Sequence, residues 1–196
     1  MLNRDSKGRF APSMLEIEAQ EFIPVPKLYF GYGSNLDILQ MKRRCRDCVP
    51  IQPAKLPGYL LTFSGVLTIA KDPSAFVLGG IYQVSDSDEG ALDIYEGYPH
   101  LYVKRYTHVT IAGKRCEVFY YVMPEDSYNV SPPSPGYYTT CERGYFDWSL
   151  DVKELEAART RSWTVRKSFY ELAAASFASR QQMKWIEPTE YITEID

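Results

Sequence analysis

Segments of strand and helix type follow one another in this chain without regular alternation, and this order is what most limits the folds available to it. Runs of aromatic and β-branched residues bounded by Gly and Pro predict strands at residues 27–32, 59–64, 76–84, 103–111 and 117–122. The last two flank Ala112-Gly113 and alternate polar with apolar residues, as a half-buried hairpin does. Because the strands do not alternate one by one with helices, the pattern predicts an α+β fold.

Helical patterns fill the intervals between these strands. Gly33 ends the first strand, and Ser34 or Asn35 is placed to cap a helix that runs toward Cys45. A short helix follows residue 85, and residues 137–148 and the chain beyond residue 151 also have helical character.

Two local features predict tertiary contacts. The short helix after residue 85 is expected to turn Ala91, Leu92 and Tyr95 inward. Gly79 and Gly80 lie inside a predicted strand, where missing side chains indicate a bulge or a close approach of backbone.

The length of 196 residues suits one domain with appendages. We expect an N-terminal arm, partly flexible, at residues 1–26, a domain at residues 27–152 and a mainly helical extension at residues 153–196. In this extension, an apolar stripe at helical spacing predicts a core or oligomer contact, so a homodimer is the candidate assembly. The stripe consists of Phe169, Leu172, Ala173 and Phe177.

Tyrosine outnumbers histidine by 16 to 2, and this ratio excludes histidine-centred metal chemistry. His100 and His108 lack the spacing of metal ligands. Cys45-x-x-Cys48 has no second pair, so we expect neither a zinc site nor a disulfide framework.

The net charge of −3 is too small to predict nucleic-acid binding, and the short basic run Lys42, Arg43, Arg44 is typical of a solvated helix face. No run of 18 apolar residues predicts a membrane span, and the N-terminal residues lack the apolar core of a secretory signal. We therefore expect a cytoplasmic protein with neither nucleic acid nor a membrane as a partner.

Three segments carry residues suited to a binding site. The first, YFGYGSNLD at residues 29–37, ends a strand with glycines and opens a helix, where free backbone N–H groups bind carboxylate or phosphate. It lacks the lysine of a P-loop and the third glycine of G-x-G-x-x-G. An ordinary strand, turn and helix cap is the alternative interpretation of the same residues.

The second segment, LDIYEGYPHLY at residues 92–102, sets Glu96 among aromatic side chains. Such surroundings raise the pKa of a carboxyl group toward the range of a general base at neutral pH. The alternative is a solvated glutamate at a helix end, with Gly97 as the cap. In the third segment, at residues 132–150, a proline-rich turn delivers Tyr137, either to a ligand or simply to the core.

Taken together, the three segments resemble the γ-glutamylcyclotransferase superfamily in order and spacing. The Y-G-S-N signature stands at residues 32–35, the L-D-x-x-E-G box at residues 92–97, and the P-S-x-x-Y box at residues 133–137, followed by Gly144 and Leu150. LPGYLLTFSG and VLGGIYQVS between them agree as well. The resemblance covers residues 28–152.

The resemblance implies a small mixed β-barrel with flanking helices, and an enzyme without a cofactor or a metal. Glu96 would be the general acid/base and Tyr137 would line the pocket. The first segment would bind the carboxylate of a small-molecule γ-glutamyl substrate; its residues are Tyr29, Phe30, Gly31, Tyr32, Gly33, Ser34 and Asn35.

The implied reaction is attack of the substrate's α-amino group on its own γ-carbonyl, which releases 5-oxoproline and a free amine. Two alternatives remain at this stage: γ-glutamyl transfer to an external amine, and a non-catalytic small-molecule binding module. The amine part of the substrate is not specified by these residues.

Overall fold

The computed structural model describes residues 27–183 of the chain, with side chains described through residue 176. The predicted N-terminal arm, residues 1–26, lies outside the described residues, as does the end of the chain from residue 184. Within the described part, the α+β fold class is confirmed.

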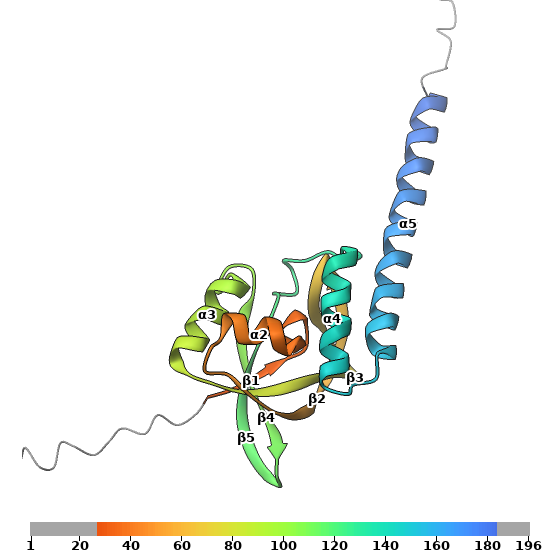
Figure 1. The fold of residues 1–196 in the computed structure, drawn as a ribbon. Helices are drawn as coiled ribbons and strands as arrows, with labels where there is room; N and C mark the ends of the chain where they lie inside the picture. The colour runs from red at the N-terminus through yellow and green to blue at the C-terminus, as the bar shows by residue number, and fades with distance from the viewer. Residues whose placement is uncertain (1–26, 184–196) are drawn as a thin grey trace, which may run out of the picture.

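The strands form one sheet in the order β2-β3-β1-β5-β4 (Figure 1). Their bounds are β1 Lys27–Gly31, β2 Val49–Ser64, β3 Val66–Val84, β4 Val103–Ile111 and β5 Lys114–Val122. Neighbouring strands are antiparallel except β1 and β5, which are parallel. The hairpin predicted around Ala112-Gly113 is confirmed, with both turn residues at positive φ.

The sheet is open, so the predicted β-barrel is correct only in a loose sense: the strands do not close into a cylinder. β2 and β4 are its two edges, and no backbone ladder joins them among the described residues. Side chains alone reach across, as where Gln52 Nε2 donates to the carbonyl of Thr110 at 3.3 Å. The twist that strands carry brings the edges toward each other without pairing them.

β2 and β3 are both much longer than predicted. The first half of β2 was not predicted as strand because it contains three prolines. Pro50, Pro53 and Pro57 lie in that half. Proline removes a ladder hydrogen bond and is tolerated at a sheet edge, and β2 is an edge strand.

The helical elements are the 3-10 turn η1 Ser34–Leu36, α2 Ile38–Arg44, α3 Asp86–Glu96, α4 Pro135–Asp147 and α5 Lys153–Met183. The cap predicted at Ser34 or Asn35 is wrong. Those residues form η1, and Asp37 caps α2 by accepting from the N–H of Gln40. The short helix predicted after residue 85 is α3, and Ser85 caps it in a reciprocal capping box with Asp88.

The helices α2, α3 and α4 lie on one side of the sheet (Figure 1). Close packing explains the paired glycines of β3. A Cβ on Gly79 would stand 2.4 Å from the Phe30 ring and 2.5 Å from the carbonyl oxygen of Gly31, both on β1. One on Gly80 would stand 2.5 Å from the Trp148 indole that follows α4. The predicted close backbone approach is therefore confirmed at Gly79, whereas at Gly80 the close group is an aromatic side chain.

α5 packs on the body through its first turns and then projects away from it (Figure 1). Leu155 and Ala158 are buried, whereas Phe169 and Leu172 are 68% and 71% exposed. A core contact for this stripe is thus wrong for its described members, and the side chain of Phe177 lies outside the described residues. The homodimer stays a prediction.

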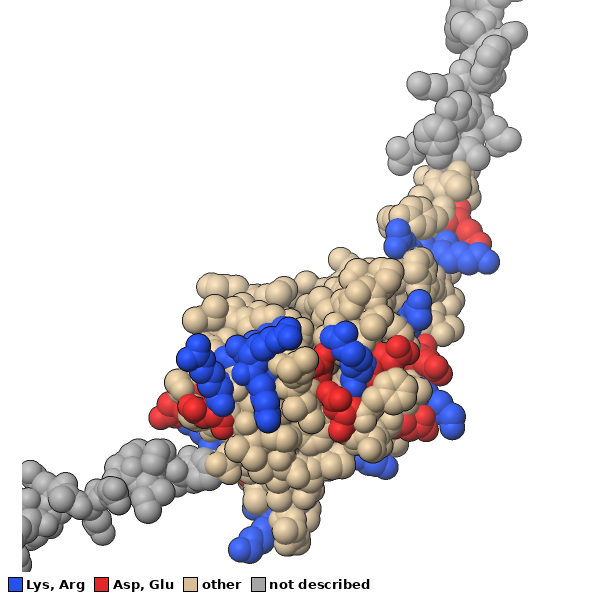
Figure 2. Space-filling model, in the orientation of Figure 1, with Lys and Arg blue, Asp and Glu red and all other residues tan. Residues whose placement is uncertain are grey.

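The surface carries both signs of charge. Figure 2 shows Lys and Arg side chains gathered over α2, with acidic side chains on either side of them. Among the described residues, no helix is long and apolar enough to cross a membrane.

Candidate active site

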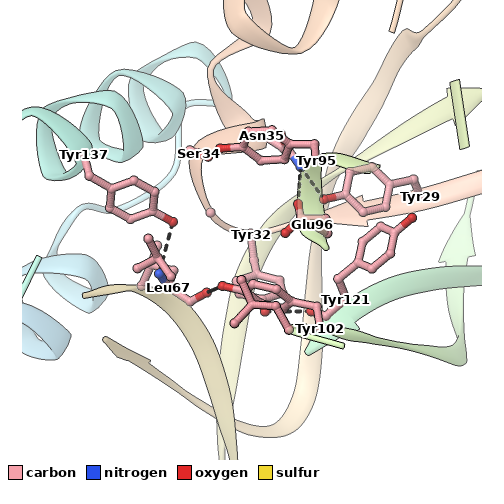
Figure 3. Close-up of a pocket in the computed structure, with 13 residues that line it drawn as sticks. Tyr29, Tyr32, Ser34, Asn35, Leu67, Tyr95, Glu96, Tyr102, Tyr121 and Tyr137 are labelled. Carbon is pink, nitrogen blue, oxygen red and sulfur yellow. Dashed lines mark hydrogen bonds between the residues drawn. The ribbon is translucent and has the colours of Figure 1, made fainter. Parts of the chain in front are cut away.

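A cavity of about 120 Å³ opens where the loop after β1 meets the C-terminal end of α3, β5 and the start of α4 (Figure 3). An apolar cavity of ~150 Å³ in a protein interior holds one benzene molecule, so this space admits a small group of a ligand. Its walls are mostly aromatic. The lining residues are Tyr29, Tyr32, Gly33, Ser34, Asn35, Val66, Leu67, Tyr95, Glu96, Leu101, Tyr102, Tyr121 and Tyr137.

Glu96 is the carboxylate among these lining residues, and α3 places it there. Gly97, at φ 64°, adopts the left-handed conformation that ends the helix directly after Glu96. Gly97 is thus the predicted cap, but the alternative of a solvated glutamate is wrong, because Glu96 is partly buried, with its carboxyl group desolvated, and lines the cavity. Asn35 Nδ2 donates to Glu96 Oε1 at 2.8 Å and to the hydroxyl of Tyr29 at 2.9 Å.

Burial raises the pKa of Glu96 from 4.5 to about 7. The positive charge of Arg44 and the hydrogen bond from Asn35 act in the opposite direction, because both stabilise the ionised form. A carboxyl group with a pKa near 7 is present in both protonation states at neutral pH, which is what a general acid/base requires.

A raised pKa alone does not identify the site, since Glu154 has the same property elsewhere. Burial also raises the pKa of Glu154 to about 7. Glu154 does not line the cavity; it lies at the start of α5, where its Oε2 accepts from the N–H of Leu78 at 3.1 Å. Glu154 lines a separate pocket with Phe76 and Leu150. The surroundings distinguish the two glutamates, because Glu96 is the one that faces the tyrosine-lined cavity of the motif segments.

Charged side chains hold α3 against the sheet. Lys104 lies between Glu89 and Asp93, with its ammonium 2.9 Å from Asp93 Oδ2 and in contact with Glu89. The hydroxyl of Tyr121 donates to Asp93 Oδ1 at 2.6 Å. These contacts join α3 to β4 and β5 and fix the helix end that carries Glu96.

The tyrosine hydroxyls of the cavity divide into two kinds. Tyr32 and Tyr102 donate to the backbone carbonyls of Tyr121 and Leu67, at 2.7 and 2.6 Å. Tyr29 and Tyr137 instead accept, from Asn35 and from the N–H of Leu67 at 3.0 Å.

A tyrosine hydroxyl that accepts a bond keeps its own proton to donate. Burial raises the pKa of both Tyr29 and Tyr137 well above its usual value, so these hydroxyls stay protonated. The cavity therefore offers two hydroxyl donors to an oxygen-rich ligand.

The loop after β1 lines this space with Gly33, Ser34 and Asn35. Ser34 and Asn35 begin the 3-10 turn, and within the described part of the chain no acceptor takes their N–H groups. α4 presses on this turn, because a Cβ on Gly144 would lie 2.5 Å from the Leu36 side chain.

Seven of the nine site residues predicted from sequence line the cavity together. They are Tyr29, Tyr32, Gly33, Ser34, Asn35, Glu96 and Tyr137. The other two predicted residues, Phe30 and Gly31, do not line the cavity. Phe30 is fully buried against Gly79, because successive side chains of a strand point to opposite faces. Gly31 packs its backbone beside the Tyr29 ring and does not line the cavity.

Sequence reasoning missed several wall residues. Tyr102 closes the second motif segment but was not singled out, Tyr121 lies on a predicted strand outside the motifs, and Val66, Leu67 and Leu101 carry no chemical signal. Tyr95 was expected to point inward, yet it is 45% exposed. Its ring lies at the edge of the cavity, with its hydroxyl 3.3 Å from Ser34 Oγ.

No group of three His, Cys, Asp or Glu side chains that could hold a metal ion occurs among the residues described. Cys45 and Cys48 are buried free thiols. Burial raises the pKa of Cys45 to about 12 and also raises the pKa of Cys48, which keeps both thiols protonated.

Comparison with known proteins gives a consistent result. The family model for "Gamma-glutamyl cyclotransferase, AIG2-like" matches residues 29–140. A solved structure named gamma-glutamyl cyclotransferase is similar with a TM-score of 0.59 and 24% identity, over 88% of this chain and 94% of that one. A search of curated proteins found no match.

Two further solved structures share the fold. The uncharacterized protein loc79017 from Homo sapiens has a TM-score of 0.58 and 23% identity, over 87% of this chain and 93% of that one. YkqA from Bacillus subtilis has a TM-score of 0.57 and 22% identity, over 71% of this chain and 55% of that one. At these identities the structures support the fold alone.

Proposed function

Because the chain belongs to the gamma-glutamyl cyclotransferase, AIG2-like family, we propose that it cleaves a γ-glutamyl amide and releases 5-oxoproline and a free amine. The observation that carries this proposal is Glu96, a partly buried carboxylate with a pKa of about 7 in a tyrosine-lined cavity.

In this proposal the substrate supplies the nucleophile. Glu96 takes one proton from the α-ammonium group, and the neutral α-amino nitrogen then attacks the γ-carbonyl carbon. The new C–N bond closes the five-membered ring. Glu96 gives its proton to the leaving nitrogen as the original C–N bond breaks, so the carboxylate is regenerated in each cycle. The ring nitrogen passes its surplus proton to the freed amine, which leaves as an ammonium ion.

The pKa of Glu96 suits both halves of this cycle. An α-ammonium group has a pKa of ~7.7–8.0, so its proton passes to a carboxylate of pKa about 7 at a cost of about 1 kcal/mol. The same transfer to an ordinary glutamate of pKa ~4.3 costs about 5 kcal/mol. Burial of Glu96 therefore lowers the cost of preparing the neutral amine.

Binding is assigned to the loop and to the two hydroxyl donors. The N–H groups of Ser34 and Asn35 would bind the α-carboxylate of the glutamyl group. Tyr137 would donate its proton to an oxygen of the same group. The attack is intramolecular, and binding holds the glutamyl group in the folded shape that orients the amine toward the carbonyl. Oriented reactions of this kind reach effective molarities of ~10⁵ M or more.

The test is a mass-spectrometric screen of γ-glutamyl compounds with the wild-type protein. γ-Glutamyl peptides, γ-glutamyl polyamines, a γ-glutamyl amino sugar and γ-glutamyl-ε-lysine would sample the amine part. We expect equal amounts of 5-oxoproline and free amine from at least one class, and none with the Glu96→Gln variant.

Two other outcomes would contradict the proposal. A new γ-glutamyl amide formed with an added amine, without 5-oxoproline, would indicate transfer to an external acceptor. Saturable binding of a γ-glutamyl compound with no product at any pH would indicate a binding module.

A further inference from the structure

We propose that Arg44 is a positioning residue, which holds the Asn35 amide in the one orientation that lets it donate to Glu96. The effect of Arg44 on catalysis rests on the proposed function, whereas its effect on the Asn35 amide and on Glu96 does not. Arg44 does not line the cavity, and it acts through Asn35.

Arg44 lies at the C-terminal end of α2 and is held from two sides. Its Nη1 donates to Asn35 Oδ1, and its guanidinium lies 3.2 Å from the centre of the Tyr95 ring. A planar guanidinium can stack on a ring and donate within its own plane at the same time. Its neighbour Arg43 is exposed on the same helix.

The orientation of the Asn35 amide matters because its two ends carry different hydrogen-bonding groups. Asparagine has one accepting oxygen and one nitrogen with two protons, whereas arginine can only donate. With Oδ1 facing Arg44, both protons of Nδ2 are available for Glu96 and Tyr29. A flipped amide would turn its oxygen toward Glu96, and the ionised carboxylate has no proton for that contact.

Arg44 is also the charged group that acts on Glu96. The other titratable groups that line the cavity with this carboxyl are tyrosines. Tyr95 lies on α3 itself. Five come from elsewhere: Tyr29 from β1, Tyr32 after it, Tyr102 before β4, Tyr121 from β5 and Tyr137 from α4. Burial raises the pKa of each of these five, so all stay neutral near pH 7.

Loss of Arg44 therefore removes both the fixed amide donor and the nearby positive charge. Each of the two stabilises the ionised form of Glu96 against burial. Their combined loss leaves burial unopposed, and the carboxyl then keeps its proton to a higher pH.

The experiment is an NMR titration of the Glu96 carboxyl carbon in ¹³C-glutamate-labelled protein, assigned by its absence in Glu96→Gln. Arg44→Gln is compared with wild type and with Arg43→Gln, which removes the same charge one residue away. We expect the Arg44→Gln midpoint to rise by about one pH unit, since a neighbouring opposite charge shifts a carboxyl by about that much or more. Arg43→Gln should titrate like wild type.

Arg44→Lys is the second variant, and it covers the case in which Arg44→Gln does not fold. Lysine keeps the charge but not the planar fork, so its midpoint should lie above that of wild type and below that of Arg44→Gln. Unchanged midpoints in every folded Arg44 variant would overturn the proposal.

Turnover gives the catalytic readout. The acidic limb of the pH profile for 5-oxoproline release should move with the NMR midpoint, so that the rate lost at pH 7 in Arg44→Gln is largely recovered above pH 8.5. A rate loss that is the same at every pH would count against positioning. The titration needs no substrate, so an inactive wild-type protein would contradict the proposed function and leave this inference standing.

Discussion

Replacing Glu96 with Gln should abolish turnover and, at alkaline pH, make the folded protein more stable. The substitution keeps the size of the side chain and an oxygen that can accept from Asn35, as Glu96 Oε1 does. It removes the group that takes and returns a proton. General acid–base catalysis contributes roughly 10²–10⁴-fold, so 5-oxoproline release should fall by at least that factor.

The gain in stability follows from the pKa of Glu96. Its folded value of about 7 lies above the ordinary value of 4.5 that the unfolded chain has. Below pH 4.5 both states carry the proton and no penalty arises. Between pH 4.5 and 7 the folded state binds more protons than the unfolded state, so stability falls as the pH rises.

Above pH 7 the full penalty is present, and one pKa unit corresponds to 1.36 kcal/mol. The difference between 4.5 and about 7 therefore costs the wild-type fold about 3 kcal/mol. The glutamine is neutral in both states and avoids this cost. The free energy of unfolding of Glu96→Gln should thus exceed that of wild type by about 3 kcal/mol at pH 8, and the two values should be nearly equal at pH 4.5.

The assay is urea unfolding of both proteins at pH 4.5 and pH 8, with 5-oxoproline release measured at pH 8. Glu154→Gln is the matched control, because Glu154 has a raised pKa of the same size and lies outside the cavity. It should show the same dependence of stability on pH, and it should keep its turnover.

Two results would refute the reasoning. Turnover of Glu96→Gln within tenfold of wild type would exclude this carboxyl from the chemistry. A stability difference between Glu96→Gln and wild type that is the same at both pH values would show that burial does not raise the pKa of Glu96.

Two further substitutions test the packing around the site. Tyr137→Phe removes the acceptor of the Leu67 N–H, so we expect a loss of about 1–3 kcal/mol in urea unfolding and a higher KM; unchanged values of both would contradict the assigned hydrogen bond. Gly80→Ala places a Cβ 2.5 Å from the Trp148 ring and should cost about 1–3 kcal/mol, whereas Gly136→Ala, with open space around its Cβ, should not destabilise the fold. Equal stabilities of the two alanine variants would show that the packing at Gly80 is looser than described.

Local patterns predicted much of the fold. The hairpin around Ala112-Gly113 and the short helix after residue 85 depend on neighbouring residues, and these predictions hold. The cap at Ser34 or Asn35 is a local prediction that failed, because these residues form a 3-10 turn and Asp37 caps α2. The length of β2 was underestimated because it depends on distant contacts. The first half of β2 contains three prolines that are acceptable only because the strand is an edge, and edge position is a property of the whole sheet.

The candidate site shows the same division. Seven of its nine predicted residues line the cavity, since they lie within short motif segments whose residues stay close together in the fold. Phe30 was included by its position in the motif, and the pleat of β1 directs it into the core. Tyr121 was not predicted, because its place in the wall depends on β5 lying beside β1.

By itself, the sequence determined the α+β class, the order of the three motif segments and the family to which the chain belongs. Only the tertiary structure decided which of two glutamates with a pKa near 7 lines the cavity that the motif segments form, and which cation opposes the burial of Glu96. The physical reason is that motif and periodicity are local, whereas desolvation and charge coupling depend on side chains brought together from distant parts of the chain. The scarcity of histidine is compatible with this arrangement, because burial gives Glu96 a pKa close to that of a histidine.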